Sequence, residues 1–427
     1  MDNDDGSLTH LEAVAGNGLL HRRVFLTQGA AMLGGSFLTA QAVRAVEPAS
    51  FPQTMHLPGA AASGYGERSR FESGVARTTR PGRGAVPNAA VSLTPLERIE
   101  GTITPSALHF ERHHSGIPDI DPDQHRLLVH GLVRRPLEFG IDALHRYPLV
   151  SRVHFIECSG NSSSLGAPQP TQGTPGQLHG LLSCSEWTGV PLSTLLDEAG
   201  IEPAAQWILA EGADSAAMSR SVPLAKALDD ALVALYQNGE ALRPGNGYPV
   251  RLLLPGYEGN TSVKWLRRIK LTAGPTMTKD ETSKYTDLLP DGKSRMFSLT
   301  MDPKSVITNP SFGQKMQGPG LYQVSGLAWS GHGRIRRVEV SADGGRSWAE
   351  AALSELVASK AATRFRMPWR WSGGPAVLMS RAVDERGNVQ VSRSQLLERM
   401  GRNFNYHNSA ITCWSVSANG EIAHVYA

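Results

Sequence analysis

The chain has 427 residues, of which 19% are charged, and its formal net charge is +3. This length allows two or three domains, and so small a net charge without a long basic run argues against a nucleic-acid-binding protein. The three cysteines are too few for a disulfide framework, and the absence of CxxC and CxxCH argues against a thiol-redox pair and a covalently attached haem.

Residues 1–45 are predicted to be a twin-arginine signal peptide that lies outside the fold. Arg22 and Arg23 precede a mildly apolar run rich in glycine and alanine, which closes on small residues at 40–42 and at Ala45. This arrangement is typical of an export signal. The alternative is a transmembrane anchor, but about 15 apolar residues interrupted by glycines fall short of the ~20 that span a bilayer. The sequence therefore predicts export to the periplasm and no membrane span.

Two regions of different character follow the predicted signal. Residues 46–95 are rich in Pro, Gly, Ser and Arg without periodicity, so we expect an extended N-terminal arm. Residues 96–290 mix helical and strand patterns, and no GxGxxG or P-loop motif supports a nucleotide cofactor. The predicted elements are strands at 125–133, 152–158, 249–256 and 263–272, with a loop at 257–262 between the last two, and a helix at 191–200 that ends at Gly200.

The pattern changes to short alternating runs in residues 291–427. Such runs at 320–331, 334–351 and 376–390, separated by tight turns such as 343–345, predict a β-sandwich of immunoglobulin type. The predicted fold class is therefore α+β, with a mixed α/β domain at 96–290 followed by an immunoglobulin-like (Ig-like) β-sandwich. The tryptophans expected to serve as core and interface aromatics of this sandwich are Trp329, Trp348, Trp369 and Trp371.

The end of the strand at 152–158 carries the most informative chemistry, because Cys158 is followed directly by Ser-Gly-Asn. A free cysteine is most often a buried structural residue. As a nucleophile Cys158 would need a histidine base, and His130, His154 and His179 are available without a diagnostic spacing. Zinc would need more protein ligands, whereas a thiolate can supply the one protein bond to a metal held by an organic sulfur cofactor. The residues alone leave these alternatives open.

Several long motifs, in the same order, resemble the sulfite oxidase family of molybdenum enzymes over residues 95–427. Residues 158–161 are similar to the family's Cys-Ala/Ser-Gly-Asn loop, and "HFERHH" at 109–114 resembles its Phe-x-Arg-Asn-His segment. Tyr285 stands where the family has its active-site tyrosine. The remaining matches are the acidic loop at 211–215, the long pterin-binding signature at 246–271 and the dimerisation-domain motif at 326–348.

The resemblance implies a molybdenum–molybdopterin cofactor, with Cys158 as the protein ligand of the metal and Arg112 and Tyr285 as further catalytic residues. Molybdopterin carries a phosphate and a polar ring system, so its pocket needs cations and polar groups. The implied cofactor-binding residues are Arg112, His114, Cys158, Asn161, Asn246, Arg251, Gly259, Asn260, Ser262 and Lys264. The resemblance also implies a homodimer and, since no haem motif is present, a separate c-type, dihaem cytochrome subunit that accepts the electrons.

The departures from the family pattern concern positive charge. Ser162 and Ser163 replace two arginines, Asn246 replaces a histidine and Thr261 replaces an arginine that helps to bind sulfite. Losing these charges argues against a pocket for a small free dianion. The pattern resembles the sulfane dehydrogenase branch of the family, which belongs to the periplasmic thiosulfate-oxidising system, and implies sulfane sulfur on a carrier protein as the substrate.

The sequence allows three alternatives to this function. The runner-up is a sulfite dehydrogenase that oxidises free sulfite and reduces a cytochrome. A second alternative is an enzyme of another class, a Cys/His hydrolase centred on Cys158. A third is a protein without enzymatic activity, an exported Ig-domain binding protein. Stoichiometric molybdenum would exclude the last two.

Overall fold

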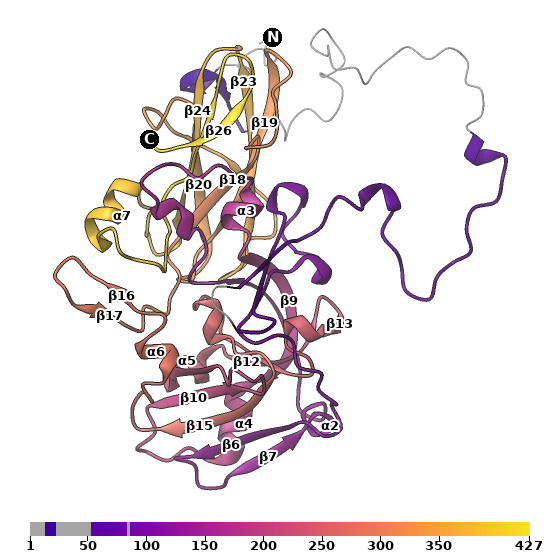
Figure 1. The fold of residues 1–427 in the computed structure, drawn as a ribbon, viewed down its shortest axis with the longest axis vertical. Coiled ribbons are helices and arrows are strands. Elements are labelled where there is room, and N and C mark those ends of the chain that lie inside the picture. Colours follow the sequence, from indigo (N-terminus) through magenta and orange to yellow (C-terminus); the bar gives the residue numbers. More distant parts are fainter. Residues whose placement is uncertain (1–12, 23–52, 83–85) are drawn as a thin grey trace, which may run out of the picture.

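The computed structural model describes residues 13–22, 53–82 and 86–427. These residues form two bodies along the long axis of the molecule, a mixed body at one end and a β-sandwich at the other (Figure 1). The predicted α+β class and the order of the two domains are confirmed. Within the described ranges, no helix is both long enough and apolar enough to cross a membrane.

Two five-stranded sheets build the mixed body. The first has the order β11-β10-β15-β6-β7 and the second the order β13-β12-β9-β8, with β14 paired to β12. The strands of the first sheet are β6 (Arg126–Gly131), β7 (Leu137–Gly140), β10 (Trp207–Gly212), β11 (Ser219–Pro223) and β15 (Leu266–Thr272). Those of the second are β8 (Val150–Glu157), β9 (Leu182–Pro191), β12 (Leu232–Gln237), β13 (Glu240–Ala241) and β14 (Arg251–Leu253).

Short helices cover and connect these sheets. Helix α4 (Leu192–Ala199) buries the leucines and the alanine that recur three and four residues apart, as an amphipathic helix does. It ends at Gly200, whose φ of 72° suits glycine. The other helices are α2 (Ile141–Leu144), α3 (Pro175–His179), α5 (Leu224–Asp229), α6 (Lys279–Thr282) and, in the C-terminal region, α7 (Arg393–Met400).

The predicted elements of this domain are confirmed, with one difference in their arrangement. The predictions at 125–133, 152–158 and 191–200 correspond to β6, β8 and α4. The neighbouring predictions at 249–256 and 263–272 correspond to β14 and β15, which lie in different sheets because β14 pairs with β12 and β15 pairs with β10 and β6. The loop at 257–262 therefore crosses from one sheet to the other.

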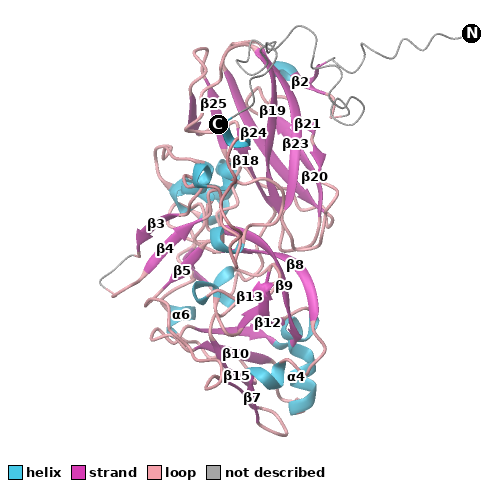
Figure 2. Cartoon of the chain, turned by 90° about the vertical axis from the view of Figure 1, so that its right-hand side faces the viewer, coloured by secondary structure: helices cyan, strands magenta, loops and turns pink. Residues whose placement is uncertain are grey.

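The C-terminal body consists of two packed sheets (Figure 2). Their apolar inner residues form one buried cluster that includes Val338 and Leu378 from one sheet and Val324 and Phe365 from the other. The first sheet contains β18 (Lys304–Asn309), β19 (Gly320–Trp329), β22 (Ala352–Leu353) and β23 (Thr363–Trp371), and the second β20 (Ile335–Ser341), β21 (Ala349–Glu350), β24 (Ala376–Asp384), β25 (Cys413–Val416) and β26 (Ile422–Val425). A separate hairpin precedes it, β16 (Asp287–Leu288) and β17 (Ser294–Arg295).

The expected core role holds for three of the four tryptophans. Trp329, Trp369 and Trp371 are buried. Trp348 is only partly buried, and the Arg381 guanidinium carbon lies 4.3 Å from its ring centroid.

The N-terminal region differs from the expectation at two places. Residues 13–22 belong to the fold, because β1 (Ala13–Ala15) and β2 (Leu19–Leu20) form a hairpin that pairs with β23 and buries both leucines. Arg23 and the apolar run of the predicted signal lie outside the described residues. The end of the predicted arm also joins the body, since β3 (Thr78–Pro81) and β4 (Ala90–Leu93) form a sheet with β5 (Glu111–His113).

Candidate active site

The Cys158 loop is fixed at both ends by backbone hydrogen bonds. The Cys158 amide donates to the Leu181 carbonyl at 3.0 Å, and the Asn161 amide donates back to the Cys158 carbonyl at 2.8 Å. Ser162 then takes a left-handed conformation with φ of 62°. The strand β8 thus ends in a tight turn that leaves the half-buried thiol of Cys158 at the edge of a cavity.

Asn161 stabilises this loop from inside. Its side-chain amide donates to Glu157 Oε1 at 2.9 Å, and its oxygen accepts from the Leu181 amide at 3.2 Å. One donor and the acceptor oxygen of this side chain are therefore bonded to the end of β8 and to the residue before β9. Asn161 thus orients the Cys158 loop, and it lies in the wall of a second cavity at Cys158. Its role in binding the cofactor stays a prediction.

A buried polar network connects the same loop to the Ig-like domain. Lys304, at the start of β18, donates to Glu157 Oε1 at 3.0 Å and to Ser162 Oγ at 2.6 Å. Ser162 Oγ also lies 2.6 Å from His179 Nδ1, and Trp329 Nε1 donates to Glu157 Oε2 at 2.7 Å. Burial lowers the pKa of Lys304, and the Glu157 carboxylate opposes this shift. The cation beside Ser162 thus comes from the other domain.

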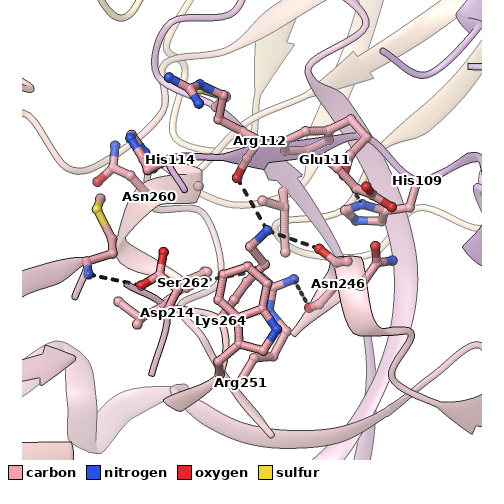
Figure 3. Close-up of a pocket in the computed structure, with 18 of the residues that line it drawn as sticks. His109, Glu111, Arg112, His114, Asp214, Asn246, Arg251, Asn260, Ser262 and Lys264 are labelled. Carbon is pink, nitrogen blue, oxygen red and sulfur yellow. Dashed lines mark hydrogen bonds between the residues drawn. The ribbon is translucent and has the colours of Figure 1, made fainter. Parts of the chain in front are cut away.

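A pocket below Cys158 gathers most of the predicted site residues. The 109–114 segment, the signature at 246–264 and Tyr285 all contribute to its wall. Figure 3 shows His114 and Asn260 on one side, His109 and Asn246 on the other, and Lys264 between them. The predicted residues in this wall are Arg112, His114, Cys158, Asn246, Arg251, Gly259, Asn260, Ser262, Lys264 and Tyr285.

Lys264 is the central cation of this pocket. Its ammonium donates to the carbonyls of Arg112 at 3.3 Å and Gly245 at 3.0 Å (Figure 3). The ammonium lies 3.0 Å from His113 Nδ1. It also lies 4.3 Å from the centroid of the Trp265 ring. Burial and the positive charge of Arg251 lower the pKa of Lys264 to about 7. An anion in the pocket would restore the charged form.

Three buried polar atoms of the pocket residues have no hydrogen-bond partner in the described parts of the chain. They are His109 Nε2, Asn246 Oδ1 and Arg251 Nε. Their own side chains are otherwise well held, since Arg251 donates to the carbonyls of Asn246 and Ser262 at 2.8 Å each. Asn246 Nδ2 donates to Gln237 Oε1 at 2.7 Å. Because unpaired buried polar atoms are costly, these three indicate a polar ligand.

His109 and Glu111 belong to the pocket but were missed in the sequence. His109 Nδ1 donates to the Phe110 carbonyl at 2.8 Å, and burial lowers the pKa of His109 to about 3. The lone pair of its Nε2 is therefore free for a ligand at neutral pH. Burial alone would raise the pKa of Glu111, but hydrogen bonds from His113 and Arg77 lower it to about 2. Three imidazoles within six residues were the signal that could have found His109.

Tyr285 closes the site next to Cys158. Its hydroxyl lies 3.3 Å from His114 Nε2, and its backbone has a φ of 54°. Arg220, a buried residue that the sequence did not single out, places its guanidinium carbon 4.9 Å from the Tyr285 ring centroid. Burial raises the pKa of Tyr285 well above its ordinary value, so its hydroxyl keeps its proton.

A second and much wider cavity meets the first at Cys158. Its volume is about 1,400 Å³, and both cavities are lined by Arg112, His114, Cys158, Met218 and Tyr285. Ser162 and Ser163 lie in its wall, together with β3, the start of α6, the residues that follow α6 and the 405–406 segment. Metal chemistry at Cys158 would therefore be open to large substrates.

The four substituted positions do not all face the wide cavity, which corrects the prediction that the substrate pocket lacks positive charge. Thr261 is fully buried and donates its hydroxyl to the Glu258 carbonyl at 2.7 Å, and Asn246 lies in the inner pocket. Only Ser162 and Ser163 of the four substituted positions line the wide cavity. The cations in its wall are Arg80, Arg112, Lys279 and Lys284. The cavity is therefore not depleted of positive charge, because neighbouring elements supply it.

Comparisons with known proteins agree with this geometry. Residues 114–279 match the oxidoreductase molybdopterin-binding domain, and residues 295–413 match the Mo-co oxidoreductase dimerisation domain. Mouse mitochondrial sulfite oxidase is 31% identical over 319 residues, which cover 68% of this chain and 58% of the mouse protein. Chicken sulfite oxidase is 31% identical, with 68% of each chain covered. The chain thus spans little more than half of the mouse protein.

A solved structure is similar over nearly its whole length. The crystal structure of the sulfane dehydrogenase SoxCD from Paracoccus pantotrophus gives a TM-score of 0.86 at 42% identity. The match covers 88% of this chain and 97% of that chain.

Proposed function

The chain belongs to the sulfite oxidase family of molybdenum oxidoreductases, and from this premise we propose that it oxidises sulfane sulfur bound to a carrier protein. The observation that carries this substrate is the cavity of about 1,400 Å³ that reaches Cys158, Arg112 and Tyr285. A free sulfite ion needs only a small part of that space. A sulfur atom on a polypeptide arm needs a wide approach, and the similarity to a sulfane dehydrogenase supports the same substrate class.

The inner pocket fits the family's molybdenum cofactor. Its unpaired polar atoms on His109, Asn246 and Arg251 suit the donors and acceptors of a pterin ring, and Lys264 and Arg112 suit its phosphate. Gly259 has a packing role, because a Cβ there would lie 2.9 Å from the Glu157 carbonyl. Because Gly259 has no Cβ, the signature loop can lie close to strand β8, which leads to Cys158.

When bound, the cofactor supplies the two-electron oxidation of a sulfur atom. Cys158 would be the protein ligand of the metal, and the turn at 158–161 fixes its direction. His114 is neutral at pH 7, because burial and the Arg112 charge lower its pKa to about 4. It can therefore accept the proton of the Tyr285 hydroxyl in a hydrogen bond. Arg112 lies at the junction of the two cavities, where its guanidinium can donate hydrogen bonds to an anion.

A steady-state comparison of two substrates tests the proposal. With a c-type cytochrome as electron acceptor, we expect kcat/KM for carrier-bound sulfane sulfur to exceed that for free sulfite by at least ~10-fold, since only the former uses the wide cavity. Sulfite dehydrogenase is the second candidate, favoured by Arg80, Arg112, Lys279 and Lys284 in the cavity wall. Efficient sulfite oxidation with no turnover of the carrier would establish that second candidate instead.

We further propose a periplasmic location and a c-type dihaem cytochrome as the partner. The support is the arginine pair Arg22–Arg23 before an apolar run, and the absence of a haem motif in the sequence. Replacing both arginines with lysine should retain the precursor in the cytoplasm, because the export receptor recognises the arginine pair. The matched control replaces Arg134 and Arg135, two consecutive exposed arginines of the mixed body, with lysine. Normal periplasmic yield of the first variant would contradict the proposal.

A further inference from the structure

Residues 13–22 lie on the Ig-like domain, more than 300 positions away in sequence from the strand that they contact. The β1–β2 hairpin pairs with β23 through Leu19 opposite Trp369, and it adds two short strands to the edge of the sheet (Figure 2). Leu19 and Leu20 are 0% and 1% exposed. Leu19 belongs to the buried cluster of the sandwich, together with Trp369 and Trp371. The segment is thus bound as a strand with two apolar anchors.

The turn between the two strands is recognised through polar contacts. Asn17 Nδ2 donates to the carbonyls of Ala342 at 2.9 Å and Pro375 at 3.2 Å. The indole Nε1 of Trp369 donates to the Asn17 carbonyl at 2.7 Å, and the Gly16 amide donates to Ser347 Oγ at 2.7 Å. These bonds come from three separate parts of the Ig-like domain. The position of the segment is therefore fixed by these hydrogen bonds and also by the burial of its leucines.

The glycines on either side of Asn17 make the recognition specific to sequence. A Cβ at Gly18 would lie 2.0 Å from the Arg370 carbonyl oxygen, and the φ of Gly18 is 88°. A Cβ at Gly16 would lie 2.1 Å from Asp343 Oδ2. A side chain at Gly18 would require the hairpin to move, because it would meet backbone at a positive φ, whereas one at Gly16 would displace the Asp343 carboxylate. By contrast, a Cβ at Gly59 in the N-terminal arm would meet no atom within 4 Å.

We propose that the Ig-like domain carries a peptide-binding groove along the edge of β23, and that its ligand is the chain's own Gly-Asn-Gly-Leu-Leu segment, residues 16–20. Main-chain pairing supplies affinity. Selectivity comes from the two glycines, the Asn17 side-chain amide and the buried positions of Leu19 and Leu20. Arg22, which forms an ion pair with Glu350, lies two residues after this segment. Binding therefore attaches the start of the predicted export signal to the folded Ig-like domain.

Hydrogen exchange on the full chain tests the proposal. The protein is purified from a host without twin-arginine export, so that residues 1–45 are retained. We expect the amides of residues 13–22 to exchange at least ~10-fold more slowly than those of an unstructured chain. Gly18→Ala and Asn17→Ala should remove this protection and leave β18, β19 and β24 protected. Gly59→Ala is the matched control and should change nothing. Coil-like exchange of residues 13–22 in the wild type would overturn the proposal.

A second experiment identifies the source of the bound segment. A site for a sequence-specific protease is inserted between Gly34 and Gly35, and the cut protein is examined by native mass spectrometry. The fragment of residues 1–34 should stay bound, and excess synthetic peptide of residues 12–22 should displace it. The same peptide with Gly18→Ala should not compete. Immediate loss of the fragment, or displacement by both peptides alike, would refute the groove. Protection that disappears on dilution would show that a second copy supplies the segment, which also contradicts the proposal.

Discussion

At the scale of single residues, the position of Cys158 explains why a single cysteine would be enough as the protein ligand of the metal. Burial raises the pKa of the Cys158 thiol, whereas the Gly160 amide and the Arg112 charge lower it. A thiol in this setting becomes a thiolate most readily by binding a metal ion, which releases its proton. Cys184 and Cys413 are more deeply buried than Cys158, and burial raises their pKa values to about 12 and about 11, but neither lines the two cavities at Cys158.

Cys158→Ser should give a folded protein whose activity falls beyond the ~100-fold that a change outside the ligand shell causes at metal sites. A hydroxyl is a poor substitute for a soft thiolate on molybdenum. Activity and molybdenum content are measured together with circular dichroism. Cys184→Ala and Cys413→Ala are the controls and should cost stability at most. Wild-type turnover by the Cys158 variant would remove it from the metal site.

Lys264 gives a prediction about pH. Its pKa is about 7 in the folded chain against the ordinary 10.5, so the unfolded chain holds one more proton between these values. Stability of the cofactor-free protein should therefore be lost as the pH falls from 10.5 towards 7, by at most ~1.4 kcal/mol per pH unit.

Urea unfolding at pH 7, 8 and 9 measures this slope. Lys264→Met should reduce it, whereas Lys270→Met, at an exposed position of β15, should not. A bound phosphate group should also flatten the slope, because it raises the pKa of Lys264 again. Equal slopes for the wild type and the Lys264 variant would contradict the assigned shift.

At the scale of elements, the catalytic loop depends on a strand of the other domain. β8 delivers Cys158, but β18 delivers the Lys304 cation that binds Glu157 and Ser162 beneath the loop. The network is buried, so each of its groups depends on the others for hydrogen bonds. The geometry of the loop is thus a property of the contact between the two domains.

Lys304→Met should destabilise the protein by roughly 3–5 kcal/mol, because it leaves the Glu157 carboxylate buried without its cation. Adding Glu157→Gln should recover part of this loss, since the unpaired charge is then gone. Urea unfolding of the single and double variants measures both effects, with the exposed Lys315→Met as control. Purely additive losses would show that the two groups are not coupled.

At the scale of the whole molecule, the two domains share a buried hydrophobic cluster, so neither has a core fully separate from the other. One buried cluster joins Phe155 and Leu182 of the mixed body to Val306 and Trp329 of the sandwich. The C-terminal body also matches a dimerisation domain. Both features make the sandwich a part of the structure that supports the active site.

Light scattering of the intact chain should therefore give a homodimer, with twice the 45.9 kDa of one chain. Truncation near residue 295 should yield an insoluble or monomeric product, because it exposes Phe155 and Leu182 and removes Lys304 from the Cys158 loop. A monomeric mass for the intact chain would argue against association through the sandwich.

The sequence alone determined the local elements and the chemistry of the pocket. Helix α4 and strands β6 and β8 follow from hydrophobic periodicity, and the predicted cofactor residues follow from motifs in order, because both signals are encoded in neighbouring positions. Ten of the eleven predicted site residues line the inner pocket. The family of the chain could be identified for the same reason.

Only the tertiary structure decided which distant side chains meet. Lys304 lies 142 positions from Ser162 beside the Cys158 loop, and Arg220 of β11 contacts Tyr285 in the loop before β16. Thr261 is buried and donates its hydroxyl to the Glu258 carbonyl, and Asn161 donates to Glu157 at the end of β8. The Gly-Asn-Gly-Leu-Leu segment binds a strand that the sequence gives no reason to connect with it. Such contacts depend on how the two sheets and the sandwich pack together, and a local pattern contains no information about that packing.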